Sequence, residues 1–284
     1  MHYYKEEAII RDINKILSSH NLPAIKYGDI TITNLTATDG VKAEEILSRN
    51  ITDHIWPSIF STTAYHYTSA SSAENILNNN NFRLYNLEKN FHADEIVAFC
   101  KDHSLLGYLQ TDSNGDPYYK TDIMSQIYSA SFADIGASIK DQILMWNTFA
   151  PGNSGVRLKL NLTSNRGDLR KIAYSKNSKQ KLQVLKELTE KILKDHKINF
   201  TLSGISRLCA FYLPQKYGYE SEIRMLHKHV PNSGINLTPK IHGQYNCIEI
   251  PLGQESMGYR IDVIEICTNF KLGVPPGYKI IPKP

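Results

Sequence analysis

The chain of 284 residues lacks several features that would place it quickly in a class. Its four cysteines are far apart and form no C-x-x-C pair, which argues against both a disulfide framework and a zinc site. No window approaches the roughly 18 uninterrupted apolar residues that a membrane helix needs. Charged residues precede any apolar run at the N-terminus, which argues against a signal peptide. We therefore expect a cytoplasmic protein without membrane association.

Familiar catalytic motifs are missing as well. The sequence contains no G-x-x-x-x-G-K-[ST], no G-x-G-x-x-G after a strand, no G-x-S-x-G, no H-E-x-x-H and no Ca²⁺ loop. His227 and His229 form the tightest histidine pair, but no Cys or carboxylate accompanies them at ligand spacing. We expect no metal site.

Charge is present but unevenly distributed. The net charge is +4, whereas Arg157 to Lys197 holds twelve Lys and Arg against four Asp and Glu, a local charge of +8. Such an excess can attract an RNA or DNA phosphate backbone, although a solvated lysine-rich helix face explains it equally well. We refer to residues 157–197 as the basic stretch.

The hydrophobic pattern predicts a mixture of helices and strands. An apolar stripe at Ile9, Ile13, Ile16 and Leu17 predicts a helix over 5–18, and alternation in Val156–Leu162 is the clearest strand signal. Helices are also expected over 41–47, 70–79, 138–148 and 182–192, and strands over 30–33, 64–68, 82–85, 127–132, 222–226, 247–250 and 261–266. Because no regular βαβ alternation appears, we expect an α+β fold. We expect residues 1–60 to form a helical appendage and 61–284 one main domain.

Two short segments carry candidate chemistry. In Tyr65-His66-Tyr67-Thr68, a mid-strand histidine between aromatic residues can present one ring nitrogen to a sugar hydroxyl, or it can be a satisfied core histidine. In Glu220-Ser221-Glu222, two carboxylates separated by one residue point the same way on an extended chain. Such a pair can serve in catalysis, or it can simply be solvated.

Three blocks in this order resemble a bacterial family of domains of unknown function. The family has a Y-H-Y-T-like strand, a central M-W-x-x-[YF]-A-x-x-x-x-G-V block and a late Y-E-x-E-x-R block. Here these are Tyr65–Thr68, Met145–Val156 and Tyr219–Arg224, and the strand Tyr128–Phe132 resembles the family's C-F-S element. The family's N-D-P-[FY]-E stretch is replaced by residues 86–95, so substrate choice can differ. The resemblance covers about 63–270.

The order of strand histidine, helix and late glutamate is also similar to the ADP-ribosyltransferase fold, with its split β-sheet core. This resemblance implies that His66 binds the NAD ribose, that Glu222 is catalytic and that Glu220 positions the acceptor. An aromatic side chain would stack on nicotinamide: Tyr85, with Tyr67 and Tyr128 as rivals. Ser131 lies in the C-F-S-like strand and completes the expected NAD-binding set.

The leading hypothesis is therefore an NAD-dependent ADP-ribosyltransferase that acts as a bacterial toxin or phage-defence effector. NAD would be its substrate, and no metal would be required. The acceptor would be RNA or DNA held by the basic stretch, or a protein; an antitoxin is a further expected partner. Two alternatives remain open: a non-catalytic module that senses a nucleotide, and an NAD glycohydrolase.

Overall fold

The structure is a computed structural model. It describes residues 2–39, 45–90, 93–124, 127–134, 139–150, 154–165, 167–174, 182–213, 215–229 and 239–283. Helices and β-sheets both contribute, and most strand pairs are antiparallel, so the expected α+β class is confirmed. Among the helices of these residues, none is long and apolar enough to cross a bilayer.

The chain divides into two compact units, and each unit is built from separated segments. Unit 1 combines residues 1–57, 91–126 and 173–214, and unit 2 combines residues 58–90, 127–172 and 215–284. The first boundary lies close to the one expected at residue 60. The remainder, expected as one domain over 61–284, contributes instead to both units. Long-range packing causes this difference, because it joins the N-terminal segment to residues more than a hundred positions away.

Unit 1 is mainly helical. Its elements are α1 (His2–Ser19), β1 (Thr31–Ile32), β2 (Thr36–Asp39), α2 (Ile46–Ile55), α5 (Ala93–Asp102), η1 (Leu106–Leu109), η2 (Lys120–Met124), β8 (Ala173–Tyr174), α8 (Gln183–His196), β9 (Asn199–Leu202), α9 (Ile205–Ala210) and β10 (Tyr212–Leu213). Strands β1, β2 and β9 form a small sheet in that order, while β8 and β10 pair in parallel. Of the helix expected over 41–47, residues 41–44 lie outside the described part, and α2 begins only at Ile46 and continues to Ile55, beyond the predicted end.

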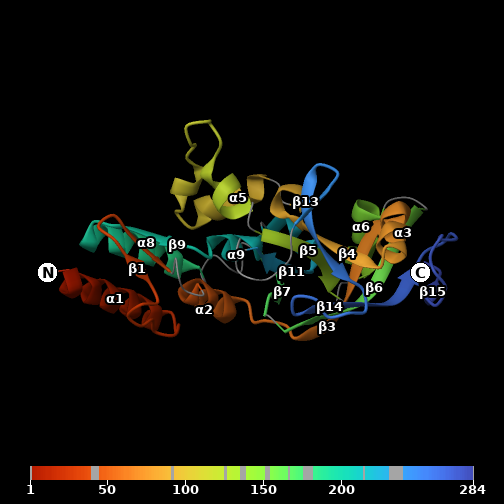
Figure 1. The fold of residues 1–284 in the computed structure, drawn as a ribbon, viewed down its shortest axis with the longest axis horizontal. Coiled ribbons are helices and arrows are strands. Elements are labelled where there is room, and N and C mark those ends of the chain that lie inside the picture. The colour runs from red at the N-terminus through yellow and green to blue at the C-terminus, as the bar shows by residue number, and fades with distance from the viewer. Residues whose placement is uncertain are drawn as a thin grey trace. The chain divides into compact units, whose positions relative to one another are not determined.

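Helices α1 and α8 lie side by side (Figure 1). The predicted apolar stripe of α1 is buried, with Ile9, Ile13 and Leu17 at 0% exposure. On α8, the residues Leu185, Leu188 and Ile192 are likewise buried. Two polar pairs flank this apolar packing: His20 with Glu187 at 2.9 Å and His196 with Asp12 at 3.0 Å. The N-terminal helix is therefore an integral part of unit 1.

Unit 2 is built around one large sheet. Its elements are β3 (Ser61–Ser69), α3 (Ala70–Asn78), β4 (Asn81–Asn86), α4 (Leu87–Asn90), β5 (Ile127–Asp134), α6 (Ile139–Phe149), β6 (Gly155–Ser164), β7 (Leu169–Lys171), η4 (Gln215–Glu220), β11 (Glu222–Lys228), β12 (Lys240–His242), β13 (Tyr245–Pro251), β14 (Tyr259–Cys267) and β15 (Ile280–Ile281). The strand order is β12-β13-β4-β5-β3-β6-β14-β15, and β11 joins β5 to β7. All strands and helices predicted in this region are present.

Strand β5 connects the parts of this sheet. Along its whole length it pairs with β11, from Ile127 opposite Lys228 to Ala133 opposite Glu222. Its other partners are β4 near the start, where Ser129 faces Tyr85, and β3 at the end, where Ala133 faces Tyr65. The sheet is therefore divided between β4 and β3 beside the middle of β5.

The two faces of the sheet differ in chemistry. One face, which we call the core face, carries a large apolar cluster, including Leu158, Leu160, Phe132, Ile223 and Ile250. Antiparallel partners point to the same side and neighbours along a strand to opposite sides. Tyr65, Ala133 and Glu222, which are paired across three strands, therefore lie together on the opposite face, which we call the site face.

Candidate functional site

The three sequence blocks meet on the site face. A small cluster of buried side chains contains Tyr67 from the first block and Met145 and Ala150 from the second, together with Ala133 of β5. Half-buried aromatic residues from all three blocks, Tyr65, Trp146 and Tyr219, pack against it. We call these seven residues the aromatic cluster. Segments about 80 positions apart in the sequence thus form one surface.

Each block reaches the cluster by a different element. The register of β3 with β5 places Tyr65 beside Ala133, and Tyr67 lies two residues further on the same face. Helix α6 brings the Trp146 indole edge-to-face against Tyr67, with ring centroids 5.1 Å apart. The start of β6 lies close to the end of α6, because a Cβ on Gly155 would overlap the carbonyl oxygen of Ala150.

Glu222 is a buried carboxylate held by a buried arginine. Both oxygens accept hydrogen bonds from Arg224: Nε donates to Oε1 at 2.7 Å and the second guanidinium nitrogen donates to Oε2 at 3.0 Å. Each side chain is only 4% exposed. Such a two-point ion pair fixes the direction of the carboxylate. Glu222 pairs with Ala133 of β5, and Ala133 pairs on its other side with Tyr65. The carboxylate therefore lies at the edge of the aromatic cluster.

Glu220 lies near Glu222, but the backbone conformation between them differs from the prediction. The chain is not extended between them, because Ser221 has a φ of 43° and β11 begins only at Glu222. The Ser221 carbonyl accepts a hydrogen bond from the Asp134 amide, which anchors this turn. Strand alternation therefore does not align the two carboxylates. They still interact, since burial and the Glu222 charge raise the pKa of Glu220 to about 7.

A tyrosine supports Glu220. Tyr219 directly precedes Glu220, and interaction with its hydroxyl partly opposes the rise in the Glu220 pKa. Tyr219 also packs in the aromatic cluster, so Glu220 is linked to the second block through its neighbour. A carboxyl group with a pKa of about 7 is half protonated at neutral pH, and it can therefore accept or donate a proton during a reaction.

His66 is oriented differently from Tyr65 and Tyr67. Its ring contacts Phe82 and Phe132 edge-to-face, at 5.0 and 6.0 Å between centroids. Phe82 and Phe132 belong to the core face, so the alternation of β3 separates His66 from Glu222. The single cleft expected to join these two residues thus has no support in the sheet register.

The protonation state of the His66 ring is nevertheless well defined. Burial, opposed by the Ser131 hydrogen bond and reinforced by the nearby Lys89 charge, lowers the pKa of His66 to about 4. The ring is neutral at pH 7. Because the Ser131 carbonyl oxygen lies 3.3 Å from Nδ1, this nitrogen donates, and Nε2 is left as a hydrogen-bond acceptor. Ser131 therefore acts here through its backbone.

The three tyrosines expected to stack on nicotinamide are engaged in other contacts. Tyr85 has the Lys89 ammonium 3.0 Å from its ring centroid, and its hydroxyl lies 3.0 Å from His242 Nδ1. Tyr128 is 4% exposed within the main core. Tyr67 is 7% exposed and packs against Trp146. The half-buried rings of Tyr65 and Trp146 are better placed to meet a ligand.

Sequence reasoning missed Arg157, the first residue after the second block. Its guanidinium carbon lies 4.6 Å from the Tyr65 ring centroid and 5.9 Å from that of Trp146. Across the sheet it pairs in register with Tyr67. The signal was a cation in a strand of alternating apolar residues, directly after the G-V of the block. It was counted only as part of the basic stretch.

The basic stretch does not act as one element. Arg157, Lys159, Arg170 and Lys171 belong to unit 2, whereas the lysines of α8 belong to unit 1. Several of its cations face acids at close range: Lys171 with Asp134 and Lys191 with Asp195, both at 2.5 Å, and Lys186 with Glu190 at 3.7 Å. Residues 175–181, which hold three of its lysines, lie outside the described part.

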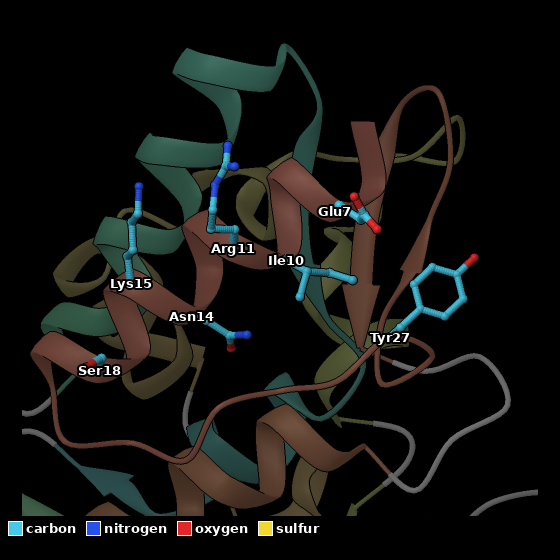
Figure 2. Close-up of a pocket in the computed structure, with 7 residues that line it drawn as sticks. All are labelled: Glu7, Ile10, Arg11, Asn14, Lys15, Ser18 and Tyr27. Carbon is cyan, nitrogen blue, oxygen red and sulfur yellow. The ribbon is translucent and has the colours of Figure 1, made fainter. Parts of the chain in front are cut away.

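A separate hollow runs along α1 in unit 1. Figure 2 shows the residues that line it: Tyr27 lies in the loop after the helix, and the α1 side chains are Glu7, Ile10, Arg11, Asn14, Lys15 and Ser18. Its charged side chains are exposed to solvent. This hollow therefore lacks the buried charged groups of the site face.

Two further observations concern known chemistry and known proteins. Within the residues that can be described, no group of three or more His, Cys, Asp or Glu side chains is arranged to hold a metal ion. Comparisons with models of protein families, with characterised proteins and with solved structures each find no match. Residues 86–95, which stand in place of the family's N-D-P-[FY]-E stretch, form the end of β4, then α4 and the start of α5. Residues 91–92 lie outside the described part.

Proposed function

We propose that the protein is a cytoplasmic NAD-dependent ADP-ribosyltransferase whose reaction takes place on the site face of unit 2. The observation that supports this proposal is the meeting of the three sequence blocks around a pair of carboxylates, one of which has a pKa near 7. Acid–base groups with pKa values near the working pH concentrate at catalytic sites. The resemblance described from the sequence supplies the reaction class.

Each carboxylate has a role in the proposed reaction. The bond between nicotinamide and ribose breaks, nicotinamide leaves as a neutral molecule with the bonding electrons, and positive charge develops at the anomeric carbon. Glu222, held in place by Arg224, would stabilise this charge, which exists mainly in the transition state. Glu220 would take the proton of the attacking acceptor hydroxyl or amine.

The aromatic cluster and His66 would bind the cofactor. Trp146 and Tyr65 offer half-buried ring faces for nicotinamide or adenine, whereas Tyr67, Tyr85 and Tyr128 are already packed. His66 would accept a hydrogen bond from a ribose hydroxyl through Nε2. Because the register places His66 on the core face, this role requires a ligand that extends past the divided edge of the sheet beside β5.

One observation favours a second candidate, a non-catalytic module that binds a nucleotide. Arg224 occupies both oxygens of Glu222, which reduces the negative charge available to a ribosyl cation. In that case the carboxylate would be structural, and nucleotide binding would persist without turnover. The two candidates differ in a single measurable product, free nicotinamide.

The test compares nicotinamide release by the wild type, Glu222→Gln and Glu220→Gln. Glu222→Gln keeps the side chain's shape and removes its charge, so we expect turnover to fall at least about a hundredfold, or roughly 2.7 kcal/mol. Glu220→Gln should reduce transfer more than NAD hydrolysis. Glu255→Gln is the matched control, since Glu255 is an exposed carboxylate of unit 2 that accepts a bond from Asn165.

The results separate the candidate functions. Release of nicotinamide that depends on Glu222 supports the enzyme, and labelled transfer to RNA, DNA or lysate proteins then separates a transferase from a glycohydrolase. Such a transferase would act as a toxin or phage-defence effector, so expression should harm cells in the wild type more than in Glu222→Gln. Nucleotide binding with no nicotinamide release from any of the proteins would support the binding module.

A further inference from the structure

Arg157 is a buried cation on the site face with unusual surroundings. The residue is 9% exposed, and its guanidinium lies against the rings of Tyr65 and Trp146. Across the sheet it lies opposite Tyr67, and it partly opposes the rise that burial causes in the Tyr67 pKa. Its Nε is buried and has no hydrogen-bond partner among the described residues. Arg157 also forms no ion pair with a carboxylate of the described residues.

This arrangement is unfavourable unless something completes it. A buried charge is normally paired, because removing it from water costs more than contacts with neutral groups return. Aromatic faces attract a guanidinium but leave its in-plane N–H groups unsatisfied. The matching group for those donors is an anion that presents two oxygens to the guanidinium, such as a phosphate or carboxylate.

A second cation lies at the same indole ring. Lys283 places its ammonium 4.3 Å from the Trp146 centroid, and its backbone amide is fixed by Asn269 at 2.8 Å. Lys159, two residues from Arg157 and paired with Tyr65, adds positive charge on the same face, where Glu265 lies opposite Lys159 and forms its ion pair with Lys279 at 2.7 Å. The neighbourhood thus combines cations with aromatic rings, which suits a ligand that carries both phosphate and a flat base.

We infer that Arg157 is the centre of an anion subsite that takes the phosphate or diphosphate of a nucleotide, beside Trp146 and Tyr65. The inference deepens the proposed function and rests on it for the choice of NAD as that nucleotide. The subsite itself rests on the burial and contacts of Arg157. It assigns recognition of the diphosphate to β6 and chemistry to the carboxylates of the third block.

The test measures binding without turnover. ADP-ribose and inorganic pyrophosphate are titrated into the full chain by calorimetry, with the wild type, Arg157→Met and Arg260→Met. We expect Arg157→Met to weaken ADP-ribose binding at least tenfold and to abolish pyrophosphate binding. Arg260→Met should bind as the wild type does, because Arg260 is an exposed arginine of the same sheet paired with Asp262 at 2.9 Å.

A thermal measurement distinguishes a binding role from a structural one. In buffer without phosphate, Arg157→Met should melt at the same temperature as the wild type or higher, because it removes an uncompensated buried charge. Pyrophosphate should then raise the melting temperature of the wild type only. If Arg157→Met does not fold, Arg157→Lys replaces it; the variant keeps the charge without the planar fork, and should also weaken ADP-ribose binding.

The outcomes are distinct from those for the proposed function. The inference is overturned if the wild type binds neither probe, or if both Arg157 variants bind ADP-ribose like the wild type. Binding that depends on Arg157 without any nicotinamide release would support the subsite and refute the transferase. Normal nicotinamide release with an unchanged KM in Arg157→Met would refute the subsite alone.

Discussion

Two ionisable side chains of unit 2 have pKa values that are shifted in opposite directions. Burial and the Glu222 charge raise the pKa of Glu220 from 4.5 to about 7, whereas burial lowers the pKa of His66 from 6.5 to about 4. Both groups are therefore mostly neutral near pH 6 in the folded protein. In the unfolded chain, each would be largely charged over part of the same range.

These shifts predict opposite slopes of stability against pH. The folded protein keeps a proton on Glu220 that the unfolded chain loses, so this group's contribution to the free energy of unfolding falls as pH rises from 4.5 to about 7. The folded protein lacks a proton on His66 that the unfolded chain binds. The contribution of His66 therefore rises as pH increases from about 4 to 6.5.

Urea unfolding of two variants over this range separates the two slopes. Glu220→Gln should leave the His66 effect and become more stable with rising pH relative to the wild type. His66→Gln should leave the Glu220 effect and show the reverse trend. If both variants follow the wild-type profile, the environments described for these two groups are wrong.

At the level of single residues, the sequence predicted identities better than orientations. The blocks drew attention to Glu220, Glu222 and Trp146, which do lie on one surface. The sequence did not reveal that Ser221 turns the chain, or that His66 faces the core, because both depend on partners in other strands. Arg157 was missed for the same reason.

Among the secondary-structure elements, the close contact between the end of α6 and the start of β6 holds the aromatic cluster in position. Gly155 approaches Ala150 so closely that any side chain at 155 must push the end of α6 away. We expect Gly155→Ala to destabilise the protein by about 1–3 kcal/mol, as overpacking typically does. It should also disturb Trp146, so near-ultraviolet circular dichroism should change together with the urea midpoint.

Gly107→Ala is the matched control for that change. A Cβ at Gly107 would meet no atom within 4 Å. The control should therefore unfold within about 0.5 kcal/mol of the wild type, as surface changes usually do. Equal stability of Gly155→Ala and Gly107→Ala would contradict the close approach of β6 to α6.

The long elements were predictable because their own periodicity defines them. The helix α1, the strand β6 and the capped start of α3, where Ser69 accepts from the Ser72 amide, all follow their local patterns. Helix α5 was overlooked although Ile96, Phe99 and Cys100 form an apolar stripe. Short strands such as β7 and β8 carry no pattern of their own and exist only through pairing.

For the molecule as a whole, the position of the N-terminal segment matters most. It was expected as a separable appendage over 1–60, yet α1 packs with α8 and β2 pairs with β9. We predict that residues 61–284 alone cannot form unit 1, because the apolar face of α8 loses its cover. Gel filtration and binding of a hydrophobic dye, compared with the full chain, should reveal aggregation and exposed apolar surface.

A second prediction for the whole molecule concerns nucleic acid. Replacing Lys179, Lys181 and Lys186 by Glu should weaken any binding to duplex DNA and lower the salt slope of log K by about 0.9 for each lost phosphate contact. Replacing Lys26, Lys101 and Lys271 by Glu is the control with equal charge outside the basic stretch. Absence of salt-dependent binding by the wild type would make the stretch a solvated surface.

The discontinuous units have a consequence for synthesis. The chain passes between them five times, and unit 1 receives its last segment only at residue 214, unit 2 only at residue 284. A ribosome releases the N-terminus first, so α1 emerges long before α8, against which its apolar stripe packs. Unit 1 can mature only after residues 173–214 have emerged, and the nascent chain must keep its early helices from aggregating until these late segments arrive. The packing of α1 against α8 is therefore expected to be a late event in the synthesis of unit 1.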